Sequence, residues 1–181
     1  MVTVCGLDPS GSSKKPTGIA VLRDNRIVFY GVKYNDVDII ETINSFKPTV
    51  VAIDSPLSFP TRGWFREVDR KMIRLGYRVL PPMWNSMKPL VERSIKIMKM
   101  LENNGIKVIE THPRSAIKSS NCSNWVELVE KNGIEIKGKQ ITNKDIIDAI
   151  IACIVALYYV KREAVSIKAS DGVIYLLPRI C

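Results

Sequence analysis

The chain has 181 residues, a length typical of one domain with a full hydrophobic core. Its apolar content of 46% and its lack of low-complexity stretches exclude a disordered protein. Lysine and arginine outnumber aspartate and glutamate by 27 to 18, and the resulting charge of +9 is typical of proteins with a polyanionic partner. An ordinary basic protein without such a partner also fits the charge.

The first third of the chain alternates short apolar runs with tight turns. We predict strands at residues 2–7, 17–23 and 26–34, joined as an antiparallel meander by the turns between them. Residues 36–46 carry apolar side chains at helical spacing and predict a helix. Residues 49–53 form an apolar fourth strand, which follows a helix and should therefore run parallel to the first.

The rest of the chain is mainly helical. We predict helices within residues 62–104, a strand at 107–110, short helices opening at Pro113 and Asn124, a helix at 143–161, and a last strand at 173–177. The longest apolar run, residues 146–160, is too short to span a bilayer and predicts a buried helix. The sequence thus predicts one domain over residues 1–181, with a basic helical insertion at about 62–104.

The order of these elements defines the expected fold class. It is an α/β fold with a mixed sheet, three antiparallel strands followed by parallel strands, flanked by helices. This is the order of the ribonuclease-H-like fold. In such sheets the ligand edge lies at the carboxyl ends of the central strands.

Acidic residues stand at this edge. Asp8, Asp54 and Glu110 each end a predicted strand, and Asp148 lies among isoleucines one turn into the long helix. A carboxylate in apolar surroundings needs a metal ion or hydrogen bonds, and a cation turns the repulsion between neighbouring carboxylates into attraction. We therefore predict catalytic roles for Asp8, Asp54, Glu110 and Asp148. We predict metal ligation by Asp8, Asp54, Asp148 and Asp145, the last of which shares a helix face with Asp148.

Four of the five acids, all except Asp148, also have a structural explanation. Asp8 could close an Asx turn, and Asp54 could cap the next helix. Glu110 could form a salt bridge with Arg114, and Asp145 suits the positive end of a helix dipole.

Oxygen ligands favour Mg²⁺ or Mn²⁺ as the cofactor. The chain has no His/Cys zinc pattern, and its one histidine, His112, could act as a base or ligand but fits a structural role beside Pro113 better. Two such ions can activate water and stabilise a leaving oxygen in nucleases.

Cysteine usage and the first residues predict a cytoplasmic protein. The four cysteines are scattered, so we expect no disulfide framework, with Cys5 and Cys153 as buried thiols. The opening MVTVCGLDPSG lacks the basic segment of a signal peptide.

A basic region accompanies the acids. Residues 62–99 hold ten lysines or arginines against three acids. Arginines recur there every four residues, which predicts a stripe suited to a phosphate backbone. Trp64 and Trp84 could stack on bases, although a solvated face with both tryptophans packed inward explains the pattern as well. The residues predicted to contact nucleic acid are Lys14, Lys15, Arg62, Arg66, Arg70 and Arg74.

Several motifs resemble known families. GLDPSGSSKKPTGIAVL resembles the opening hairpin of ribonuclease-H-like nucleases, including RuvC-type junction resolvases, and DIIDAIIA resembles the closing helix of RuvC, whose two acids also stand three apart. VAIDSPLSFP, REVDRKMIRLGYRVLPP, VIETHPRSA and DGVIYLLP are similar to domain of unknown function family 429, prokaryotic proteins described as predicted nucleases. This resemblance spans nearly the whole chain and implies a ribonuclease-H-like fold with a metal site. Against RuvC, Asp54 replaces a glutamate and residues 62–104 differ, so junction resolution does not carry over.

These observations predict a nuclease that hydrolyses phosphodiester bonds through carboxylate-bound Mg²⁺ or Mn²⁺. The expected partner is DNA or RNA, with no membrane, and self-association is left open. One alternative is a non-catalytic nucleic-acid-binding protein on the same fold. Another is a phosphotransferase of the actin and sugar-kinase type, but Ser55, Pro56 and Leu57 follow Asp54 where that class needs a glycine-rich phosphate loop.

Overall fold

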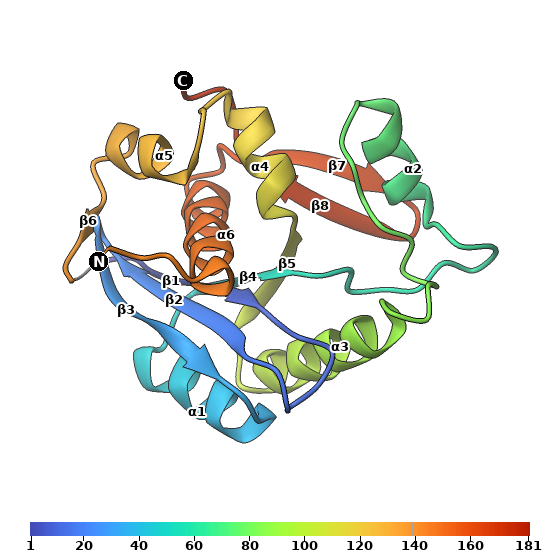
Figure 1. Cartoon of the computed structure of the whole chain (residues 1–181), viewed down its shortest axis with the longest axis horizontal. Coiled ribbons are helices and arrows are strands. Elements are labelled where there is room, and N and C mark those ends of the chain that lie inside the picture. Colours follow the sequence, from blue (N-terminus) through green and yellow to red (C-terminus); the bar gives the residue numbers. More distant parts are fainter. Residues whose placement is uncertain (139) are drawn as a thin grey trace.

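A computed structural model describes residues 1–138 and 140–181, and within them a mixed sheet of eight strands is flanked by six helices (Figure 1). The strands are β1 (Thr3–Asp8), β2 (Thr17–Arg23), β3 (Arg26–Lys33), β4 (Val50–Asp54), β5 (Lys107–Thr111), β6 (Glu135–Ile136), β7 (Val165–Ala169) and β8 (Gly172–Leu176). The helices are α1 (Asp36–Phe46), α2 (Glu67–Arg74), α3 (Lys88–Asn103), α4 (Pro113–Ser120), α5 (Trp125–Lys131) and α6 (Lys144–Val160). The predicted fold class is confirmed.

The strand order across the sheet is β6-β3-β2-β1-β4-β5-β8-β7. β1, β2 and β3 form the predicted antiparallel meander, and β4 runs parallel to β1 as expected. β5 is parallel to β4, and β8 is parallel to β5. The carboxyl ends of β1, β4 and β5 therefore meet at one edge of the sheet.

Helices cover both faces of this sheet. Buried strand residues such as Leu7 and Ile53 pack against α1 and α3 on one face. Their neighbours along the strands, such as Ala20 and Ala52, pack on the other face against α6, which lies across the middle of the sheet (Figure 1). The alternation of side chains along each strand thus separates two hydrophobic cores. None of the helices in the described residues is long and apolar enough to cross a membrane.

Helix α6 packs unusually close to the sheet because two strands carry glycine where it crosses. A Cβ atom on Gly6 would overlap the backbone carbonyl of Ala149, and one on Gly18 would overlap that of Asp145. The alanines of α6, which the sequence shows as small residues on this helix, complete the close contact. This approach brings the first turns of α6 to the carboxyl edge of β1.

In the basic region, helix α2 begins later than the four-residue spacing of the arginines predicts. α2 begins at Glu67, so Arg62 precedes the helix and Arg66 is its N-cap. A stretch of irregular backbone, residues 75–87, then leads to α3. The four arginines therefore do not form a stripe on one helix, because only Arg70 and Arg74 lie within α2.

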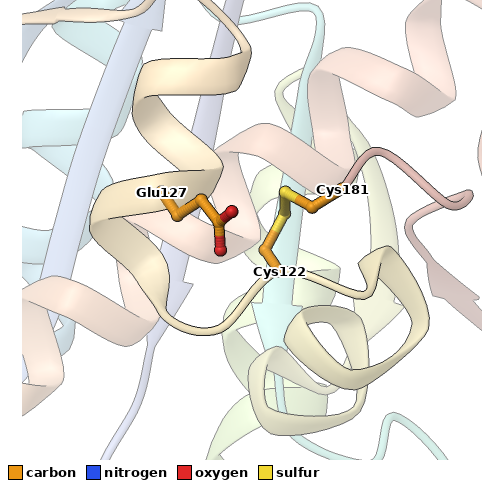
Figure 2. Close-up of side chains that lie close together, drawn as sticks. All are labelled: Cys122, Glu127 and Cys181. Carbon is orange, nitrogen blue, oxygen red and sulfur yellow. A yellow bond between two sulfur atoms is a disulfide. The ribbon is translucent and has the colours of Figure 1, made fainter.

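One disulfide corrects the cysteine prediction. Cys5 and Cys153 are buried free thiols as expected, but Cys122 and Cys181 are bonded (Figure 2). The chain returns to the end of α4, where the backbone N–H groups of residues 180 and 181 donate to the carbonyl of Ser120, and this places the two Cα atoms 4.9 Å apart. Such a pairing depends on tertiary contacts that the spacing of the cysteines does not reveal.

Candidate metal centre and its cleft

Three carboxylates from three elements meet at the carboxyl edge of the sheet. Leu7 pairs with Ile53 across β1 and β4, so Asp8 and Asp54 follow as neighbours at the ends of these strands. Asp148, on the second turn of α6, reaches them from the helix side. Carboxylate oxygens of Asp8, Asp54 and Asp148 all lie within 4.8 Å of one another. We call these three residues the acidic triad.

The electrostatics of the acidic triad favour a cation. Burial, followed by the charges of Asp148 and Asp145, raises the pKa of Asp8 to about 8. Burial and the neighbouring Asp8 raise the pKa of Asp54 well above its usual range. Burial also raises the pKa of Asp148, although the nearby positive charges of Lys144 and Arg114 oppose this rise. Three partly desolvated carboxyl groups at this separation cannot all ionise without a counter-charge, and hard oxygen ligands of this kind suit Mg²⁺ or Mn²⁺.

The raised pKa of Asp8 predicts a pH-dependent response to metal. Between its ordinary pKa of 3.8 and the value of about 8, the folded protein binds more protons than the unfolded chain, so metal-free stability falls as pH rises through this window. A metal ion that binds the deprotonated carboxylates would reverse that loss. We expect Mn²⁺ to raise the Tm several-fold more near pH 8 than near pH 6.

Thermal melts of the wild type and of Asp54→Asn, with Mn²⁺ and with EDTA, check this expectation. The variant should lose most of the Mn²⁺ response at both pH values. A Tm shift of equal size in the wild type and the variant would place the metal elsewhere.

Glu110 does not join the acidic triad, and the strand register gives the reason. Glu110 pairs with Ile53 of β4, whereas Thr111 pairs with Asp54. Because paired residues of parallel strands point to the same face, Glu110 points to the face opposite that of Asp54. The residue of β5 next to the acidic triad is Thr111, whose hydroxyl donates to the carbonyl of Tyr175.

The partner of Glu110 is Arg66. The guanidinium of Arg66 donates to Glu110 Oε1 over 2.6 Å and to Asp69 Oδ1 over 2.7 Å, and also bonds the hydroxyl of Ser58. Glu110 Oε2 in turn accepts from the backbone N–H of Leu57. The expected alternative partner, Arg114, is absent from this network, and Arg66, whose side chain is 1% exposed, is not available to hold a nucleic acid.

The surroundings of Asp145 and His112 favour structural roles for both residues. Asn143 caps α6 by accepting from the N–H groups of Asp145 and Ile146, and Asp145 lies in the first turn. Its charge reaches Asp8 and Asp148, but its carboxylate lies outside the acidic triad. Burial, followed by the charge of Arg114, lowers the pKa of His112 to about 4, so the ring is neutral near pH 7.

The remaining predicted contacts lie on the surface. Lys14 and Lys15 are exposed in the loop between β1 and β2, and Arg62, Arg70 and Arg74 are exposed around α2. Both Trp64, at 58%, and Trp84, at 44%, are exposed, unlike the inward packing that we considered.

A cleft of about 820 Å³ opens beside the acidic triad. Its walls include the ends of β1, β4 and β5, helix α4, the first turns of α3 and α6, and the irregular stretch after α2. We call it the triad cleft, and its lining includes Asp8, Asp54, Asp148, Tyr77, Arg78, Val79, Leu80, Met87, Leu90, Arg114, Lys118 and Lys144.

Sequence reasoning missed the cations of the triad cleft. Arg114 and Lys118 stand four residues apart on α4, and Lys144 Nζ lies 3.7 Å from Asp148 Oδ2. The available signal was the VIETHPRSA motif, which begins α4 directly after β5 and so carries its basic residues to the same edge.

Comparison with known proteins shows the fold. No family model and no curated protein matches the sequence, so membership of domain of unknown function family 429 stays a prediction. RuvC of T. thermophilus in complex with a Holliday junction substrate is similar over 95% of this chain and 99% of that chain, with a TM-score of 0.59 and 13% identity. A second Thermus thermophilus RuvC structure is similar over 89% of this chain and 96% of that chain, with a TM-score of 0.58 and 13% identity. The chain therefore has the ribonuclease-H-like fold that these RuvC structures share.

Proposed function

We propose that this protein is a divalent-metal-dependent nuclease, with Asp8, Asp54 and Asp148 as the ligands of Mg²⁺ or Mn²⁺. The observation that carries the proposal is the convergence of these three carboxylates, one buried and two half-buried, at the edge of a ribonuclease-H-like sheet. The fold of RuvC, whose structure includes a Holliday junction, supports a nucleic acid as the partner. The cleavage assays described below distinguish DNA from RNA as that partner.

The proposed reaction is hydrolysis of a phosphodiester. An oxygen of water forms a bond to phosphorus, the bond from phosphorus to one ester oxygen breaks, and the leaving oxygen takes up a proton. When bound, the divalent cation supplies the charge that activates water and stabilises the leaving oxygen.

The side chains around the site have separate tasks. The acidic triad holds the cation. Arg114 and Lys144 place positive charge at the rim, where the phosphate of the substrate would approach. Asp145 adds negative charge that strengthens the attraction of the acidic triad for a cation.

Cleavage assays test the proposal. Purified protein is incubated with Mn²⁺ or Mg²⁺ and with labelled RNA, single-stranded DNA, duplex DNA and branched DNA. We expect metal-dependent cleavage of at least one substrate and its reduction by at least about a hundredfold in Asp54→Asn and in Asp8→Asn, because loss of a metal ligand removes the transition-state stabilisation that the ion provides.

Asp38→Asn is the matched control, because Asp38 is an exposed aspartate of α1 that belongs neither to the acidic triad nor to the lining of the triad cleft. It should leave the cleavage rate within about threefold of the wild type. Binding of nucleic acid without cleavage by the wild type would contradict the nuclease and favour the non-catalytic binding protein.

A further inference from the structure

Part of the lining of the triad cleft is apolar, and we call this part the apolar wall. Leu80, Met87 and Leu90 line this wall, and within the described residues they belong to neither hydrophobic core. Leu80 is 53% exposed. Apolar side chains that face a cleft rather than a core are typical of the contact surface for the flat, apolar part of a ligand.

Tyr77 adds an aromatic ring to this wall. Lys118 lies over that ring, with its Nζ atom 5.8 Å from the ring centroid, and donates a 2.7 Å hydrogen bond to the carbonyl of Gly76. The backbone N–H of Tyr77 bonds the carbonyl of Met72 in α2. The wall is thus tied to α4 on one side and to α2 on the other, so it is already formed before any ligand binds.

Two cations stand free beside the apolar wall. Arg78 and Arg114 line the triad cleft, are exposed, and form no ion pair with any described residue. The cleft therefore offers three kinds of surface: carboxylates for a metal ion, guanidinium groups for phosphate, and an aromatic and aliphatic wall for a base.

The volume of the triad cleft limits which form of nucleic acid can enter it. A volume of about 820 Å³ lies within the range of pockets for small molecules, roughly 300–1,000 Å³. A continuous duplex keeps its bases stacked inside and presents only its backbone and groove edges, so it cannot lay a base face against Tyr77 or Leu80. An unpaired nucleotide exposes that face.

We propose that the wall formed by Tyr77, Leu80, Met87 and Leu90 is a base-binding subsite, and that the substrate enters the triad cleft as single-stranded nucleic acid. This inference rests on the proposed function, because the subsite binds the substrate of the proposed nuclease. The base of an unpaired nucleotide lies against the wall, and its phosphate is held by Arg114 on the side of the cleft that the acidic triad also lines.

Binding measurements test the subsite without turnover. The probe is a fluorescein-labelled single strand of about twelve nucleotides, compared with the same sequence as a duplex, in buffer with Ca²⁺ in place of Mn²⁺. Fluorescence anisotropy should show tighter binding of the single strand. Leu80→Asp should weaken that binding by about tenfold, because it replaces an apolar contact surface with a like charge facing the phosphates.

Leu75→Asp is the matched control. Leu75 is 58% exposed, lies at the end of α2, and does not line the triad cleft. It should leave the affinity unchanged, whereas Tyr77→Ala, which introduces no charge, should weaken single-strand binding. Circular dichroism melts show whether each variant folds like the wild type.

The outcomes separate this inference from the proposed nuclease. Leu80-dependent single-strand binding without Mn²⁺-dependent cleavage supports the subsite and contradicts the nuclease. Cleavage that is lost in Asp54→Asn but is equal on single strand and duplex, and unaffected by Leu80→Asp, supports the nuclease and overturns the subsite. Equal affinities of Leu80→Asp and Leu75→Asp for the single strand overturn it as well.

Discussion

Replacing Arg66 with methionine is expected to destabilise the fold by about 3–5 kcal/mol. The guanidinium of Arg66 is the counter-charge for the buried carboxylates of Glu110 and Asp69. Burial raises the pKa of Glu110 even with Arg66 in place, although the hydrogen bonds and charge of Arg66 oppose this rise. Without Arg66 both carboxylates lose their main partner, and one must take up a proton or admit water. Urea denaturation of the variant at neutral pH measures the loss.

Arg70→Met is the matched control for this experiment. Arg70 lies in α2, the helix that Arg66 caps, is exposed, and forms no ion pair with any described residue, so its replacement should cost less than about 0.5 kcal/mol. The penalty of Arg66→Met should also shrink in acid, because loss of Arg66 raises the folded-state pKa of Glu110 further, so the variant loses stability as pH rises. Equal stability of the two variants would show that the buried network contributes nothing.

Gly6→Ala should cost at least about 3 kcal/mol, because no rearrangement of a side chain can make room for the new methyl group. The atoms it meets are the carbonyl of Ala149 and the backbone nitrogen of Cys153 in α6. The helix must move away from the sheet, and Asp148 moves with it. We therefore expect a lower Tm and, in the protein that remains folded, a smaller rise of Tm with Mn²⁺.

Gly31→Ala provides the comparison on the same sheet. A methyl group there meets only the ring of Phe29 at an ordinary contact distance of 3.5 Å. It should change the free energy of unfolding by less than about 1 kcal/mol, within the range of β-propensity effects, and leave the Mn²⁺ response intact. A Gly6→Ala protein as stable as Gly31→Ala would contradict the close packing of α6 on β1.

Local patterns predicted most of the fold. The bounds of β2 and α1 agree with the prediction, because one is an apolar run between turn residues and the other has a helical apolar face with Asn35 as its cap. β7 was missed although its apolar and polar residues alternate, because the pattern covers only five exposed or half-buried residues at the edge of the sheet. β6 was missed because it has only two residues, and it exists only through its pairing with β3.

The acidic site was predictable as far as strand ends are concerned. The apolar runs predicted β1 and β4 as parallel neighbouring strands, which places Asp8 beside Asp54. Asp148 was predicted because it is a carboxylate among the apolar residues of a helix. The face to which Glu110 points could be predicted only with the pairing register of β4 and β5, because a shift of one residue along β5 moves a side chain to the other face of the sheet. The role of Arg66 required a contact across 44 residues of chain, which spacing alone cannot show.

The bond between Cys122 and Cys181 encloses the helix that carries Asp148. The two cysteines are separated by 59 positions, and α5, β6, α6, β7 and β8 all lie between them. In the unfolded chain the same bond closes this segment into a ring, which removes conformational entropy worth about 4 kcal/mol of stability by polymer theory. Oxidation of these two thiols would therefore favour the folded arrangement of the acidic triad by limiting the disorder of the unfolded chain, without a contact to any of the three carboxylates.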